Sequence, residues 1–462
     1  MTGSAERHPP AEHRAHLTAV PARLRHQAVA TLMANWRGAS TVPTSTLYPH
    51  QWSWDSAFIA VGLAHVNTGR AWSELISLFQ AQWGDGRMPH IVFNRTVPED
   101  AYFPGPRFWR PLPAAGGPPP GVATSGLVQP PVHAAAALAV ARRSPRREAR
   151  ATLRRLYPRL SAYHEYLHTR RSDGAGLVAI VHPWESGLDN SPAWDEPLNS
   201  VATDLTGIAE RRRDLAHAGS AHRPTDEDYA RYVHIAETYR DRGYADRALT
   251  ELPFCVVDPL FNALLAWSER AMAELAHLVG LPGGQHVGRA EALEAAIHGR
   301  LFDADLGCYV SVDLLSGRRA MVRTVGGLAP LLLEDVPRAH RAALVGTAVG
   351  PSFGLGSGDV LGVPSYDLTA ADLDLERYWR GPAWINTSWL VWRGLELSGE
   401  HALADDLAAA MTTLVAGAGF REYFNPLTGE GLGARDFSWS AALILSVLDH
   451  ASRNARRSAG AG

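Results

Sequence analysis

Helical periodicity, interrupted by long connections, is the feature that most constrains how this chain folds. Apolar side chains recur at helical spacing through most of the sequence, as at Leu156, Leu160 and Leu167. Strand-like stretches are short and few, near 177–182 and 308–312. The pattern predicts helices near 20–36, 55–66, 70–83, 131–143, 147–170, 203–217, 226–242, 257–280, 288–302, 326–333, 337–346, 383–397, 400–416 and 438–452.

The connections are rich in glycine and proline, and the longest span 84–130, 171–202, 347–381 and 417–437. Structureless loops of about 20 residues are rare in compact domains unless they carry function. The sequence therefore predicts an all-α toroid of paired helices, with loops at one end forming a pocket. We expect one catalytic domain over 19–451, with 171–250 as a lid or excursion, between disordered tails at 1–18 and 452–462.

Charge and residue usage exclude several classes of function. The net charge of −3 and the pI near 6.7 argue against nucleic acid and anionic membranes as partners. No apolar run reaches the roughly 18 residues of a membrane span, and residues 1–16 lack the apolar core of a secretory signal. All 44 basic residues are arginine, which excludes a Walker lysine and Schiff-base catalysis. We expect a cytoplasmic protein in which Cys255 and Cys308 are free buried thiols.

The loop from Trp184 to Pro192 is the first candidate site. It places Glu185 and Asp189 beside a tryptophan, with Gly187 between the two acids. A segment this polar and rich in turn-forming residues is a loop, and loops that carry binding sites hold large aromatic side chains. The alternative interpretation is a surface loop that the tryptophan anchors to the core.

Other loops repeat this combination of aromatic, amide and acidic side chains. Aromatic rings cover the apolar faces of a sugar, while Asp, Gln and Tyr bind its hydroxyl groups. Two of these acids have simpler explanations, because Asp55 could cap a helix starting near Ser56 and Glu422 could be solvated. The repeated residues are Tyr48, Trp52, Trp54, Asp55, Tyr102, Gln129, Tyr378, Trp379 and Glu422.

If Asp189 and Glu422 meet across one pocket, the chemistry they support is glycoside hydrolysis. One carboxylic acid must protonate the leaving oxygen, and its ionised partner must activate water or attack the anomeric carbon. Burial in an aromatic loop would raise the pKa of Asp189, which suits the acid. Arg421, with Arg435 as a second candidate, would keep Glu422 ionised as the base.

A competing motif is His164-Glu165-Tyr166-Leu167-His168, which matches the helical H-E-x-x-H pattern of zinc peptidases. No suitable third ligand follows it in the sequence. Both histidines flank the apolar stripe of the predicted helix, as on an ordinary amphipathic surface. A zinc metallopeptidase therefore remains the alternative from another class, and a sugar-binding protein without catalysis is a further one.

Several ordered motifs together resemble the bacterial glucosylglycerate and mannosylglycerate hydrolases, which are similar to glycoside hydrolase family 63. The resemblance extends from about Tyr48 to Leu448 and implies an (α/α)6 toroid, an inverting α-glycosidase and no metal or other cofactor. The motifs lie at 51–58, 89–93, 102–106, 184–192, 378–384 and 437–442.

Carried over by position, the resemblance implies Asp189 as general acid and Glu422 as general base. It implies that Arg223 and Tyr229, in a lid segment, hold a glycerate carboxylate, for which a bidentate guanidinium is suited. The remaining implied contacts to sugar and glycerate are Tyr48, Trp52, Trp54, Asp55, Tyr102, Gln129, Gly187, Tyr378 and Trp379.

The expected substrate is a small anionic glycoside, glucosylglycerate or mannosylglycerate, and a homo-oligomer is compatible with the sequence. Residues 193–222 depart from the lid of the relatives, and Phe437 replaces a residue that is polar in some glucosylglycerate-specific relatives. These departures affect the choice of sugar and acid. An α-glucosidase with the same fold that acts on neutral oligosaccharides is the nearest alternative.

Overall fold

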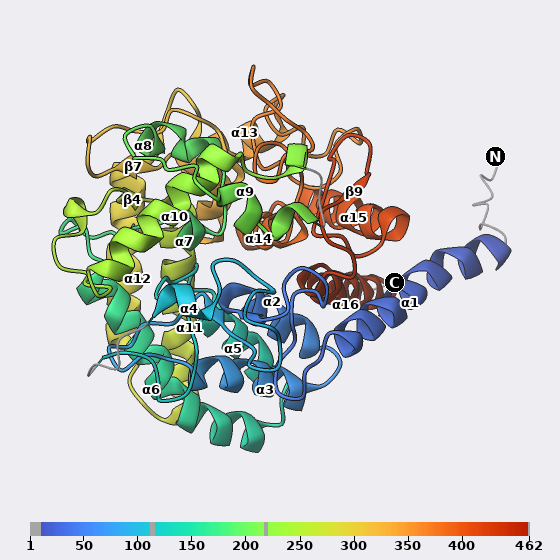
Figure 1. The fold of residues 1–462 in the computed structure, drawn as a ribbon. Coiled ribbons are helices and arrows are strands. Elements are labelled where there is room, and N and C mark those ends of the chain that lie inside the picture. Colours follow the sequence, from blue (N-terminus) through green and yellow to red (C-terminus); the bar gives the residue numbers. More distant parts are fainter. Residues whose placement is uncertain (1–10, 111–115, 217–219, 461–462) are drawn as a thin grey trace, which may run out of the picture.

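The computed structural model describes residues 11–110, 116–216 and 220–460 of the chain, and these residues are mainly helical (Figure 1). Six elements form an inner ring, because each contacts the next and the last contacts the first. In ring order they are α2 (Ser53–Leu63), α5 (His133–Ala141), α11 (Pro259–Val279), the 3-10 helix η5 (Val325–Leu332), α14 (Ile385–Ser398) and α16 (Ser438–Gly460).

An outer element packs against each inner one, which confirms the predicted (α/α)6 toroid. Figure 1 shows α1 and α16, the two ends of the chain, side by side on this ring. The outer elements are α1 (Ala11–Ala34), α3 (Thr68–Gln80), α6 (Arg146–Arg170), α12 (Gly284–Arg300), α13 (Arg338–Val349) and α15 (His401–Ala418).

Inner helices are apolar on most sides because they contact neighbours on most sides. All residues of α2 are buried, and α5 consists largely of alanine, whose small side chain permits close helix packing. Gly62 marks the closest approach, since a Cβ atom there would lie 2.3 Å from the Cα atom of Ala442 in α16. Only glycine fits where these two helices close the ring.

Two predicted helices take another form. The range 326–333 is a 3-10 helix, in which Pro330 lacks the N–H that an α-helix would use. The described part of the range 203–217, residues 203–216, contains only α9 (Ile208–Arg211) and the 3-10 turn Asp214–Ala216, so the prediction of one long helix was wrong. Arg212 ends α9 and instead bonds to Asp214 and Asp226.

Short antiparallel strands in the loops pair with one another and so connect neighbouring loops. They are β1 (Gln51–Trp52) with β2 (Ile91–Val92), β4 (Val256–Val257) between β3 (Ala179–Ile180) and β7 (Val312–Asp313), β5 (Phe302–Asp303) with β6 (Cys308–Tyr309), and β8 (Tyr423–Phe424) with β9 (Gly431–Leu432). The strands expected near 177–182 and 308–312 are present, although shorter.

The segment expected to be a lid, 171–250, carries α10 (Asp226–Asp241) and the one-turn helices α7 (Pro183–Ser186), α8 (Asp195–Leu198) and α9. A further one-turn helix, α4 (Pro106–Trp109), lies in the long loop after β2. Helix α1 begins at Ala11 and α16 continues to Gly460, so both enter the segments expected to be tails; residues 1–10 lie outside the described part.

Cys255 and Cys308 are both free and buried, as predicted. Among the described residues, no helix combines the length and hydropathy needed to cross a membrane.

Candidate active site

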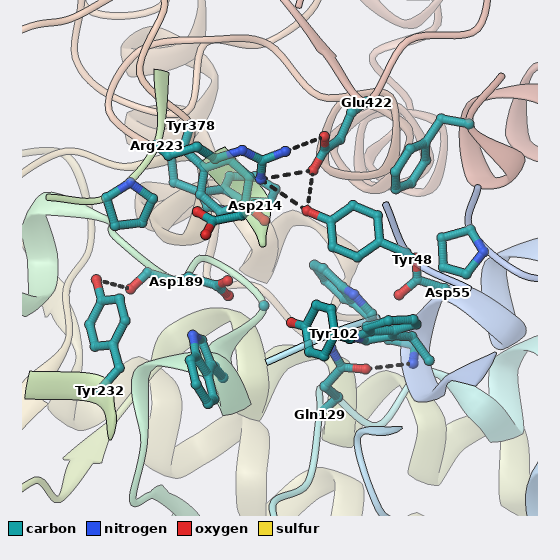
Figure 2. Close-up of a pocket in the computed structure, with 18 of the residues that line it drawn as sticks. Tyr48, Asp55, Tyr102, Gln129, Asp189, Asp214, Arg223, Tyr232, Tyr378 and Glu422 are labelled. Atoms are coloured by element: carbon teal, nitrogen blue, oxygen red, sulfur yellow. Dashed lines mark hydrogen bonds and ion pairs between the residues drawn. The ribbon is translucent and has the colours of Figure 1, made fainter. Parts of the chain in front are cut away.

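Every residue that the sequence predicted for catalysis or substrate binding lines one pocket (Figure 2). These residues come from loops far apart in the chain, which the ring brings together. They are Tyr48, Trp52, Trp54, Asp55, Tyr102, Gln129, Gly187, Asp189, Arg223, Tyr229, Tyr378, Trp379 and Glu422.

The start of α2 forms one wall. Asp55 lies in the first turn of this helix and not at its cap, because the helix begins at Ser53. The backbone N–H of Trp54 donates to the Gln129 side chain at 3.1 Å (Figure 2). Burial raises the pKa of Asp55 well above its usual range, and the nearby carboxylates Glu422 and Asp189 raise it further. The Asp55 side chain is therefore suited to hydrogen bonding with a hydroxyl-rich ligand.

Gly187 lets the predicted acid loop approach this wall. Its φ is +75°, a conformation that favours glycine, and a Cβ atom there would lie 2.5 Å from the indole ring of Trp54. A side chain at this position would displace the tryptophan. Gly187 therefore joins two parts of the pocket that are distant in sequence.

Asp189 lies two residues after Gly187, and its carboxyl group is directed into the pocket (Figure 2). The hydroxyl of Tyr232 in α10 donates to its backbone carbonyl at 3.0 Å. Burial raises the pKa of the Asp189 carboxyl to about 7, although the positive charge of Arg223 lowers it in part. The raised pKa agrees with the prediction from the aromatic surroundings of Asp189, and it suits a proton donor.

Glu422 lies directly before β8 on another side of the pocket, and its side chain is only 1% exposed. Arg223 donates to Oε2 at 2.8 Å and to Oε1 at 3.4 Å. The Tyr48 hydroxyl donates to Oε1 at 2.9 Å, and the Ala434 N–H donates to Oε2 at 2.9 Å. The Glu422 carboxyl group thus accepts four hydrogen bonds, two of them from the guanidinium of Arg223.

The ion-pair partner of Glu422 is Arg223, whereas the sequence had pointed to Arg421 and Arg435 as the neighbouring positive charges. The Arg421 guanidinium instead donates to the carbonyl of Gly433.

Arg223 is 2% exposed, and its guanidinium lies over the Tyr378 ring at 4.7 Å. It precedes α10, whose first turn is fixed by a reciprocal capping box between Thr225 and Asp228. Tyr229, in the same helix, lines the pocket and donates to the Phe103 carbonyl at 2.6 Å. The segment 171–250 thus brings a buried cation to the two acids.

Glu185, the other acidic residue of the loop that carries Asp189, does not line the pocket. It forms a bidentate ion pair with Arg171, with N–O distances of 2.7 and 2.8 Å, and both side chains are fully buried. It also accepts hydrogen bonds from the backbone N–H groups of Val128 and Val181. Glu185 therefore supports the loops that carry Gln129 and Asp189.

Eight further lining residues were outside the predicted set. Trp184, Phe437 and Trp439 belong to motifs that the sequence singled out, so their aromatic character was a usable signal. Asp214 lies in residues 193–222, which depart from the lid of the relatives, and Tyr232 resembles any helical core tyrosine. The full set is Pro43, Phe103, Trp184, Asp214, Pro224, Tyr232, Phe437 and Trp439.

The H-E-x-x-H motif lies outside this pocket. Glu165, which a zinc peptidase would need as its base, points outward and pairs with Arg289. His164 is buried with 1% of its side chain exposed, so the expectation of a surface position was wrong for this residue. His168 is partly exposed and contacts Glu269 in α11. The geometry does not support a peptidase centre.

Comparison with known proteins points to one family. Residues 48–440 match the mannosylglycerate hydrolase MGH1-like glycoside hydrolase domain. The chain is 43% identical to a mannosylglycerate hydrolase of Thermus thermophilus over 91% of this chain and 99% of the relative. It is 33% identical to a glucosylglycerate hydrolase of Mycolicibacterium hassiacum over 93% and 98% of the two chains.

Among solved structures, the chain is similar to a GH63 mannosylglycerate hydrolase from Thermus thermophilus in complex with Tris and D-glycerate. The TM-score is 0.83 at 41% sequence identity, and the match covers 91% of this chain and 99% of the other.

Proposed function

This chain belongs to the mannosylglycerate hydrolase MGH1-like glycoside hydrolase family, and we propose that it cleaves a glycosylglycerate with inversion at the anomeric carbon. It is a glycoside hydrolase by family. The observation that carries the proposed mechanism is the contrast between its two pocket acids. Burial raises the pKa of Asp189 to about 7, whereas Glu422 forms a buried ion pair with Arg223.

In this mechanism, Asp189 donates its proton to the glycosidic oxygen as the bond to the anomeric carbon breaks. Glu422 accepts a proton from a water molecule, whose oxygen attacks the anomeric carbon from the opposite face. The products are the free sugar and glycerate, and a proton returns from Glu422 to Asp189 through solvent. The aromatic wall and Asp55 hold the sugar, while the buried surroundings keep Asp189 protonated.

Arg223 supports an anionic substrate over a neutral one. A buried guanidinium beside a sugar pocket is suited to bind a carboxylate through two parallel hydrogen bonds. Glycosylglycerates supply such a carboxylate on the leaving group. A solved relative that is 41% identical was crystallised with D-glycerate, which agrees with this assignment. We propose glucosylglycerate and mannosylglycerate as the substrates to be compared.

The contacts of Glu422 suggest how Arg223 links binding to catalysis. A carboxylate has about four acceptor positions. Here they receive two hydrogen bonds from Arg223, one from Tyr48 and one from Ala434. A water molecule can therefore be bound by Glu422 only after a donor leaves. The substrate carboxylate would take Arg223 from Glu422 and so release the base.

A cytoplasmic location is part of this proposal and is supported by the free buried thiols Cys255 and Cys308.

The first test replaces each acid separately, as Asp189→Asn and Glu422→Gln, and measures hydrolysis of both glycosylglycerates. Loss of a general acid or base is expected to lower kcat by roughly 10²–10⁴-fold. Glu430→Gln, an exposed loop residue in the same segment, is the matched control and should keep normal turnover. Normal kcat in either active-site variant would remove that residue from its role.

A further inference from the structure

Four ionisable side chains meet where α6, α11 and α12 pack together, outside the catalytic pocket. His164 and His168 project from α6 one helical turn apart, Glu269 from α11 and His286 from α12. The Glu269 side chain is fully buried, and those of His164 and His286 are 1% and 5% exposed. The proposed hydrolysis does not use these residues.

The three histidines converge on the two oxygens of one carboxylate. The Nδ1 atom of His286 lies 2.5 Å from Glu269 Oε2, and Nε2 of His168 lies 2.8 Å from Oε1. The Nδ1 atom of His164 lies 3.0 Å from the same Oε1, yet it is hydrogen-bonded neither to that oxygen nor to any other group of the described chain. A buried ring nitrogen so placed calls for a partner.

A shared metal ion explains this close approach without a hydrogen bond. Ligand atoms at zinc distances of about 2.0–2.2 Å in a tetrahedral arrangement are separated by roughly 3.3 Å, and their lone pairs point at the ion rather than at one another. One ligand atom each from His164, Glu269 and His286 lie within 4.8 Å of one another. Shifts on the order of an ångström would bring these atoms to the spacing of zinc ligands.

The negative charge of Glu269 also favours a bound cation. A fully buried carboxylate requires a compensating cation. Within the described residues, every ion pair of Glu269 is with a histidine and none is with an arginine, although the chain has 44 of them. A divalent cation would supply the compensating charge directly.

We propose that His164 Nδ1, His286 Nδ1 and Glu269 bind one divalent transition-metal ion, with zinc favoured by this set of two imidazoles and a carboxylate. His168 donates to Oε1 of the same carboxylate, and the Tyr157 hydroxyl lies 3.0 Å from Nε2 of His286. Such outer contacts fix the orientation of metal ligands. His168, at 19% exposure, also gives the ion a route from solvent.

The role of this site is structural. It would join outer helix α6 to both α11 and α12. Tyr163, the neighbour of His164, donates to the Gln129 carbonyl, so a fixed α6 also supports the loop that lines the catalytic pocket. Glu165 is on the outer side of α6 with Arg289, and no peptidase chemistry follows from the motif.

The test measures metal directly, independently of hydrolysis. Protein produced with added zinc is desalted, and its zinc content is determined by mass spectrometry for the wild type, His164→Gln, His286→Gln and His277→Ala. His277 is an exposed histidine of the same helix α11 and is the matched control. We expect about one zinc ion per chain in the wild type and in His277→Ala, and loss from the two cluster variants.

The wild type alone provides a second readout in case the variants fold poorly. After chelation, readdition of zinc should raise its Tm, and Co²⁺ should produce the visible absorption of a tetrahedral site. Folded wild-type protein that binds neither ion and shows no change in Tm would overturn the proposal. The cluster would then be an ion-pair network in which an imidazolium neutralises Glu269. Neither result bears on glycoside hydrolysis, which is measured separately.

Discussion

At the scale of single residues, the pocket places its two acidic side chains in different electrostatic surroundings. Burial raises the pKa of Asp189 to about 7, and the guanidinium of Arg223 stabilises the charge of Glu422. An acid that must carry a proton works below its pKa. The rate kcat/KM should therefore fall as pH rises through about 7, which a pH–rate profile on a glycosylglycerate measures. A profile that stays flat to pH 9 would contradict the role of Asp189.

Arg223 leads to a prediction that depends on the substrate. The variant Arg223→Met loses a buried charged contact to the substrate carboxylate, which should lower kcat/KM on the order of 10²-fold for glycosylglycerates. A neutral α-glycoside of the same sugar has no carboxylate to lose, so its kcat/KM should be unchanged or higher. The measurement is kcat/KM for both substrates in the wild type and in Arg223→Met. Arg377→Met, which changes a more exposed arginine next to Tyr378, is the control. Equal losses on both substrates would indicate a structural role instead.

At the scale of elements, the ring depends on close contacts between inner helices. In Gly62→Ala the new Cβ atom would lie 2.3 Å from the backbone of Ala442, so α2 and α16 must move apart. Overpacking of this kind should lower the free energy of unfolding by about 1–3 kcal/mol. Denaturant unfolding measures the change.

The control for this change is Gly288→Ala, in α12. It meets no atom within 4 Å and should be neutral or slightly stabilising, because alanine favours a helix. If Gly62→Ala were as well tolerated as Gly288→Ala, the proposed close packing of α2 against α16 would be wrong.

The elements also differ in how well the sequence predicts them. Helices such as α6 and α11 are predictable because one face must be apolar, and this leaves a period in the sequence. The segment 203–217 is not, because the ion pairs of Arg212 with Asp214 and Asp226 follow no hydrophobic period in the sequence. The aromatic loops indicated the pocket, whereas the pairing of Arg223 with Glu422 across 199 residues left no local signal.

At the scale of the whole molecule, the closed ring explains why the pocket exists. Its lining runs from Pro43 to Trp439, so nearly the entire chain must fold before Asp189 faces Glu422. The inner ring positions the loop ends, and the segment 171–250 adds the buried cation. The cluster of His164, Glu269 and His286 belongs to the same architecture, since it joins helices that support this pocket.

The most direct test of the account is NMR observation of the first sugar released from glucosylglycerate and mannosylglycerate. The proposed mechanism attacks the anomeric carbon from the face opposite the leaving glycerate. An α-linked substrate should therefore release the β-anomer first, before mutarotation mixes the two forms, and at least one glycosylglycerate should be cleaved. Initial release of the α-anomer, or no cleavage of either substrate, would contradict the central claim.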